Sequence, residues 1–82
     1  MSFEQTLNDI NIFCAHENSS IAEFAQRSIT YAQALKQGEI SAEEYQSLLG
    51  DIETLKKMCR TADEEYQVAK IFQSAMLITS LL

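Results

Sequence analysis

Two cysteines and one histidine are the residues of this 82-residue chain best suited to do chemistry. Cys14 and His16 lie two positions apart and could supply half of a zinc site, with Cys59 as a third ligand. A zinc site needs three or four ligands, and the chain has no second closely spaced pair. The same two residues could act as nucleophile and base, but side chains two apart on a helix point about 200° away from each other. We therefore expect neither a metal centre nor a catalytic pair.

Carboxylates gather in two runs, Glu43-Glu44 and Asp63-Glu64-Glu65. Paired carboxylates can perform acid–base chemistry or bind di-iron, but di-iron bundles also use a Glu-x-x-His pattern, which this sequence lacks. The chain has only two glycines, so it has no glycine-rich phosphate loop. We expect a protein that is not an enzyme and that binds no cofactor.

One basic cluster, formed by Lys56, Lys57 and Arg60, offers an alternative function. It would allow a nucleic-acid-associated regulator, in which a helix-turn-helix variant contacts phosphates through these three side chains. Acidic residues precede the cluster, and the whole chain has six Lys and Arg against twelve Asp and Glu, a net charge of −6. This balance disfavours nucleic acid and anionic lipid, and it favours a basic protein partner.

Composition predicts one small all-α domain over residues 1–82. The chain is 46% hydrophobic, too apolar for a disordered segment, and it has no proline to interrupt a helix. No apolar run reaches the roughly 18 residues of a membrane span, and Glu4 and Asp9 lie where a signal peptide carries bases. We expect a cytoplasmic protein that is not in a membrane, in which Cys14 and Cys59 stay reduced.

Capping motifs predict where the first two helices begin. Ser2 with Gln5, and Ser20 with Glu23, have the spacing of a capping box, in which each side chain accepts the other residue's backbone N–H. The predicted helices span about 3–16 and about 21–37.

The segment after the second helix predicts a sharp turn. Gly38 occupies the position where a glycine ends a helix, and Ser41 with Glu44 forms the next capping box. Ile40 is placed to pack on Tyr45 as a hydrophobic staple. A connection this short makes the two flanking helices antiparallel neighbours, so we expect a helical hairpin.

The same turn resembles one in a known family. Residues 35–49, Leu-Lys-Gln-Gly-Glu-Ile-Ser-Ala-Glu-Glu-Tyr-Gln-Ser-Leu-Leu, look like the turn of the short C-terminal domain family. That family pairs a leucine-rich helix with a glycine, an isoleucine, a cap and an acidic-aromatic run. The resemblance covers this segment alone, and it implies a role in oligomerisation or tethering.

Beyond the turn, the sequence supports two alternatives. Apolar residues continue at spacings of three and four, which favours one helix from about 42 to 80 with a coiled-coil-like seam. Thr61 with Glu64 has the capping-box spacing, which would instead end one helix near residue 60 and begin another near 61. The seam residues are Tyr45, Leu48, Ile52, Leu55, Cys59, Ala62, Tyr66 and Ala69.

The last turns are apolar around most of the helix, and such a helix must be buried on all sides. The first two helices, with about 30 residues, are too short to cover it and the hairpin as well, so we expect a homo-oligomer. The expected interface comprises Val68, Ile71, Phe72, Ala75, Met76, Ile78, Leu81 and Leu82. The sequence therefore predicts a small acidic interaction module, an assembly factor, adaptor or inhibitor of a kind common in bacteriophages and mobile elements.

Overall fold

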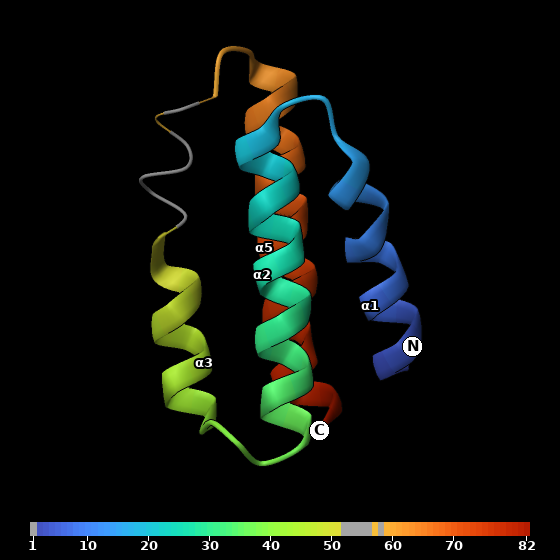
Figure 1. Cartoon of the computed structure of the whole chain (residues 1–82), viewed down its shortest axis with the longest axis vertical. Helices are drawn as coiled ribbons and strands as arrows, with labels where there is room; N and C mark the ends of the chain where they lie inside the picture. Colours follow the sequence, from blue (N-terminus) through green and yellow to red (C-terminus); the bar gives the residue numbers. More distant parts are fainter. Residues whose placement is uncertain (1, 52–56, 58) are drawn as a thin grey trace.

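The computed structural model describes residues 2–51, 57 and 59–82, which form an all-α fold with no strand among them (Figure 1). Successive helices run in alternate directions along the long axis, so that α2 and α5 are parallel (Figure 1). The helices are α1 (Phe3–Asn11), α2 (Ser19–Lys36), α3 (Ala42–Leu48) and α5 (Ala62–Leu81), with 3-10 turns η1 (Ile12–Ala15) and η2 (Leu49–Asp51).

The core lies where α1, α2 and α5 pack against one another. Each of these helices buries one stripe of apolar side chains, and the stripe of α5 steps by three and four residues, the spacing of a single helix face. Ser28 is buried in this core and donates its hydroxyl to the Phe24 carbonyl at 2.8 Å. The buried apolar residues are Leu7 and Ile10 of α1, Ile21, Phe24, Ala25 and Ala32 of α2, Val68, Ile71, Ala75 and Ile78 of α5, and Tyr45 and Leu49 at α3 and η2.

The first helix begins as the sequence predicts and ends earlier. The capping box at Ser2 is present, since the Ser2 hydroxyl accepts the Gln5 N–H at 3.2 Å and the Gln5 side chain accepts the Ser2 N–H at 3.3 Å. The prediction of a helix to about residue 16 is wrong. After Asn11 the chain tightens into η1, a common ending for an α-helix.

The second predicted cap was placed at the wrong residue. Asn18 has extended backbone angles, and its side-chain oxygen accepts the Ser20 N–H at 2.9 Å, so α2 begins at Ser19. The Glu23 carboxylate does not complete a capping box for α2, because it pairs with Arg27 at 2.6 Å, one turn further along the helix.

The turn after α2 has the expected capping chemistry. Gly38 takes a φ of +78°, a left-handed conformation that favours glycine. The Glu39 N–H donates to the Ala34 carbonyl at 2.9 Å, as in a Schellman motif. The capping box predicted at Ser41 is confirmed, with the Glu44 N–H donating to the Ser41 hydroxyl at 3.1 Å.

The prediction of one unbroken helix from about 42 to 80 is wrong, and the alternative of a break near 61 is confirmed. Residues 59–61 are not helical, and Thr61 is extended. Its hydroxyl accepts the Glu64 N–H at 3.1 Å and begins α5. The expected seam is therefore split between helices. Tyr45 is buried whereas Tyr66 is 62% exposed, and Ile52 and Leu55 lie outside the described residues.

Tyr45 attaches α3 to α5. Its side chain is fully buried, and its hydroxyl donates to the Ala75 carbonyl at 2.7 Å. It is the buried residue of α3, whose other side chains are exposed. Burial also raises the pKa of the Tyr45 phenol, because the phenolate would lose its hydration.

Replacing Tyr45 should separate the contribution of its hydroxyl from that of its ring. We expect Tyr45→Phe to lower the free energy of unfolding by about 0.5–1.5 kcal/mol through the lost hydrogen bond. Tyr45→Ala should cost about 3–5 kcal/mol, because it also leaves a cavity. Urea denaturation of both variants measures this. Equal stability of Tyr45→Phe and wild type would contradict the role given to the hydroxyl.

The buried phenol should also make stability depend on alkaline pH. Its folded-state pKa is raised, so its contribution is complete below the pKa of an unfolded tyrosine, about 10, and is lost as the pH rises above that value. We expect the free energy of unfolding to fall less in Tyr45→Phe than in wild type between about pH 9 and about pH 11. Identical falls in the two proteins would show that Tyr45 does not contribute.

Candidate functional site

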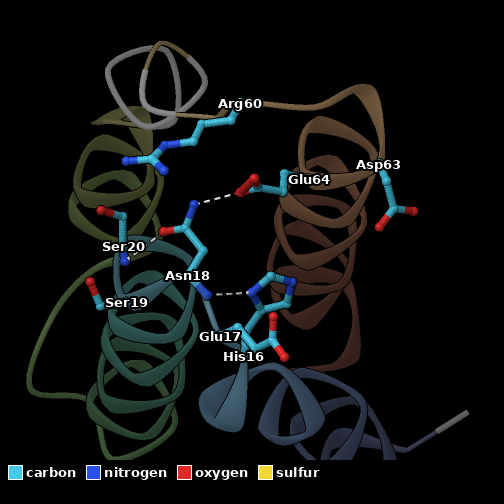
Figure 2. A pocket seen from close by; sticks show the side chains of 8 residues that line it. All are labelled: His16, Glu17, Asn18, Ser19, Ser20, Arg60, Asp63 and Glu64. Atoms are coloured by element: carbon cyan, nitrogen blue, oxygen red, sulfur yellow. Dashed lines mark hydrogen bonds between the residues drawn. The ribbon is translucent and has the colours of Figure 1, made fainter.

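A polar hollow of about 770 Å³ lies at the end of the bundle where α2 and α5 begin (Figure 2). It brings the chain's one histidine together with carboxylates and a guanidinium that are far apart in sequence. Its lining residues are His16, Glu17, Asn18, Ser19, Ser20, Arg60, Asp63 and Glu64.

Asn18 is the centre of the hydrogen bonds in this hollow. Its side-chain oxygen caps α2, and its side-chain NH₂ group donates to Glu64 at 2.5 Å (Figure 2). Its backbone N–H donates to Nδ1 of His16 at 2.9 Å. His16, which the sequence offered as a zinc ligand or base, thus closes the turn between η1 and α2. The hydrogen bond between Asn18 and Glu64 therefore connects the cap of α2 to the acidic first turn of α5.

This arrangement offsets the partial positive charges of two helix N-termini that lie close together. Because α2 and α5 are parallel, their N-termini lie at the same end of the molecule, and each N-terminus carries a partial positive charge. The first turn of α5 holds three carboxylates, Asp63, Glu64 and Glu65, which offset that charge. The acidic run that could have suggested acid–base chemistry therefore has a structural use.

The surroundings of both thiols disfavour the thiolate form. Burial raises the pKa of Cys14. The pKa of Cys59 is raised by burial and, to a lesser degree, by the charges of Glu64 and Glu65. The thiolate is the reactive form, so both environments lower reactivity. The two cysteines are not joined in a disulfide, and the described residues contain no three Cys, His, Asp or Glu side chains grouped to hold a metal.

The basic cluster of the alternative function is not assembled into a phosphate-binding surface by the described residues. Lys57 and Arg60 are exposed, and Lys56 lies outside the described residues. Arg60 lines the same hollow as Asp63 and Glu64. Carboxylates this close to a guanidinium repel a phosphate, so the surroundings of Arg60 weigh against nucleic acid.

Half of the expected oligomer interface lies inside the chain's own core. Val68, Ile71, Ala75 and Ile78 are fully buried. The expectation that the first two helices cannot cover these residues is wrong, because α1 and α2 both pack on α5. Of the remaining four, Phe72, Met76 and Leu81 are half-buried and Leu82 is 55% exposed.

A different set of residues forms the surface that α5 turns outward. Leu77 is 42% exposed and Tyr66 is 62% exposed. A shallow, mainly apolar hollow lies on the C-terminal half of α5, lined by Phe72, Gln73, Met76, Leu77 and Ser80. We call Tyr66, Ala69 and these five residues the outer face of α5. The interface prediction omitted Leu77 and Tyr66, although their spacing from Gln73 already places the three on one helix face.

The Asn18 link should stabilise the end of the bundle. We expect Asn18→Ala to lower the free energy of unfolding by about 1 kcal/mol for the lost cap, with a further loss from the broken Glu64 contact. Asn18→Ser should fall between Ala and wild type, because a hydroxyl can cap α2 but is too short to reach Glu64. Urea denaturation gives all three values.

Asn11→Ala is the matched control for these variants. Asn11 is exposed and its side chain makes no capping hydrogen bond, so its removal should change stability by less than about 0.5 kcal/mol. A loss in Asn11→Ala as large as that in Asn18→Ala would contradict the assignment.

Comparison of the chain with protein-family models, with curated proteins and with solved structures gives no match. The likeness of residues 35–49 to the short C-terminal domain family is therefore limited to capping residues that suit any tight helical turn. No described helix has the length and apolar character needed to cross a membrane. The functional inference rests on the surfaces of the molecule itself.

Proposed function

We propose that the chain is a small interaction module, which acts by binding protein through the outer face of α5. The observation that carries this proposal is the distribution of charge. The whole chain has a net charge of −6, whereas residues 71–82 include no Asp, Glu, Lys or Arg. A long uncharged helix surface on an acidic protein is typical of a contact surface, since the centres of interfaces are depleted in charged residues.

The outer face also has the composition of a binding surface. It combines two aromatic rings, a methionine and an exposed leucine, and aromatic residues and methionine are enriched at protein interfaces. Tyr66 and Leu77 are accessible, whereas Phe72 and Met76 are half-buried and so held in place by the core. Anchors that are already ordered lose less conformational entropy on binding.

The acidic residues outside the outer face would influence how the chain first approaches a partner. Glu43 and Glu44 lie in the first turn of α3, and Asp63 and Glu65 lie in the first turn of α5. All four side chains are exposed. Such charges would attract a basic partner at long range and repel an acidic one, and added salt would weaken both effects. An assembly factor, an adaptor or an inhibitor would each use this combination, and the reduced thiols of Cys14 and Cys59 fit a cytoplasmic setting.

A charge placed on the outer face should abolish binding without unfolding the chain. Leu77 is exposed and is not part of the core, so Leu77→Glu should fold normally. In an extract of the organism that encodes the chain, we expect wild type to elute from a sizing column in an assembly larger than its 9.3 kDa monomer. Leu77→Glu should elute as the monomer, because a buried unpaired carboxylate disfavours contact.

Ile12→Glu is the matched control. Ile12 is 73% exposed and lies in η1, away from the outer face. This variant adds the same charge and should elute with wild type. Monomeric wild type in the extract, or an assembly that persists in Leu77→Glu, would overturn the proposed function.

A further inference from the structure

We infer that the partner of the outer face is a second copy of this chain, packed antiparallel with Gln73 on the two-fold axis. The inference rests on the proposed function and specifies the partner that the same surface binds. It follows from the spacing, the charge and the side-chain sizes along α5.

The spacing of the outer face is that of a helix–helix contact. Tyr66, Ala69, Gln73, Met76 and Ser80 follow one another at steps of three, four, three and four. This is the repeat with which one helix packs along another. Tyr66, Gln73 and Ser80 are exposed, and Ala69 and Met76 are half-buried, so the row is open to a partner along its whole length.

The charges of the outer face fit a second copy better than a basic protein. The row contains no carboxylate, so a partner's lysines and arginines would find no counter-charge along it. A second copy presents the same neutral surface. Two copies with a net charge of −6 repel elsewhere, and the five residues of the row bring no charged side chain of their own into the contact.

Side-chain size along the row determines whether the two copies of α5 pack antiparallel or parallel. When two copies of α5 pack antiparallel about Gln73, Tyr66 lies opposite Ser80 of the second copy, and Ala69 lies opposite its Leu77. Tyr66 and Leu77 then each meet a small side chain, as interdigitated packing requires. Met76 lies opposite the alkyl stem of Lys70 of the second copy. In a parallel pair, Tyr66 would lie on Tyr66 and Met76 on Met76, while Ala69 and Ser80 would leave gaps.

The centre of the row also suits a two-fold axis. A glutamine amide has both donors and an acceptor, so two copies of Gln73 can exchange reciprocal hydrogen bonds across the axis. A polar residue at the centre of an apolar helix contact specifies its register, because any shift leaves the amide unpaired. Glu65 and Lys70 flank the row. The Lys70 ammonium lies 5.7 Å from the Tyr66 ring centroid, and antiparallel packing separates it from Lys70 of the second copy.

Disulfide trapping tests the partner and the register together. Single cysteines at positions 66, 73 and 80 are introduced by substitution into a Cys14→Ser, Cys59→Ser chain, and each purified protein is oxidised. We expect Gln73→Cys to form the cross-linked dimer about tenfold faster than Tyr66→Cys or Ser80→Cys alone, because a disulfide cannot bridge Cα atoms more than about 7 Å apart. A mixture of Tyr66→Cys and Ser80→Cys should cross-link with each other.

Light scattering on the purified wild-type chain keeps the inference testable if a cysteine variant fails to fold. We expect a dimer whose fraction rises with added salt, because salt screens the repulsion between acidic copies. A purified monomer, with a larger assembly still seen in the cell extract, would overturn the second-copy inference and leave the proposed function standing. Equal cross-linking at all three positions would overturn the antiparallel packing.

Discussion

The arrangement of the helices depends on the break in the chain before α5, where the Thr61 hydroxyl accepts the Glu64 N–H and caps the new helix. Without that break, the most apolar part of the sequence would continue away from the first two helices. With it, α5 returns parallel to α2 and buries one of its faces against α1 and α2. One face only can be satisfied in this way, so the opposite face of an apolar helix remains at the surface.

The parallel arrangement of α2 and α5 has a cost that the polar hollow offsets. Two positive helix ends at one end of the molecule disfavour each other. Asn18 and Glu64 convert this contact into a linked pair of caps, and His16 orders the turn that leads into it. His16 and Glu64, two of the residues best suited to chemistry in the sequence, therefore stabilise the fold.

Local chemistry was predictable from the sequence, and long-range contacts were not. The caps at Ser2 and Ser41 depend on residues three positions apart, so their spacing is sufficient to find them. The cap at Asn18 was missed because Ser20 and Glu23 offer the same pattern two residues later, and the pairing of Glu23 with Arg27 competes with it. The Tyr45 hydroxyl reaches a carbonyl thirty residues away, which no local pattern encodes.

The sequence also does not show which face of the C-terminal helix is buried and which is exposed. Its apolar residues cover most of the helix circumference, so hydrophobic periodicity does not say which of them meet α1 and α2. Periodicity alone therefore predicts a partner contact for Val68 and Ile71, although both are core residues, and it does not single out Leu77. Once the core was known, the remaining face could be described by its spacing and its lack of charge.

The central claim is that protein contacts form along the outer face of α5 and not elsewhere. The most direct measurement is a dilution series of the isotope-labelled chain, followed through its backbone amide resonances. The account predicts concentration-dependent shifts at Tyr66, Gln73, Leu77 and their neighbours on the outer face, with the amides of α1 and η1 unchanged. Shifts confined to α1 and η1 would contradict the central claim, and resonances that do not change with concentration would overturn the second copy as the partner of this face.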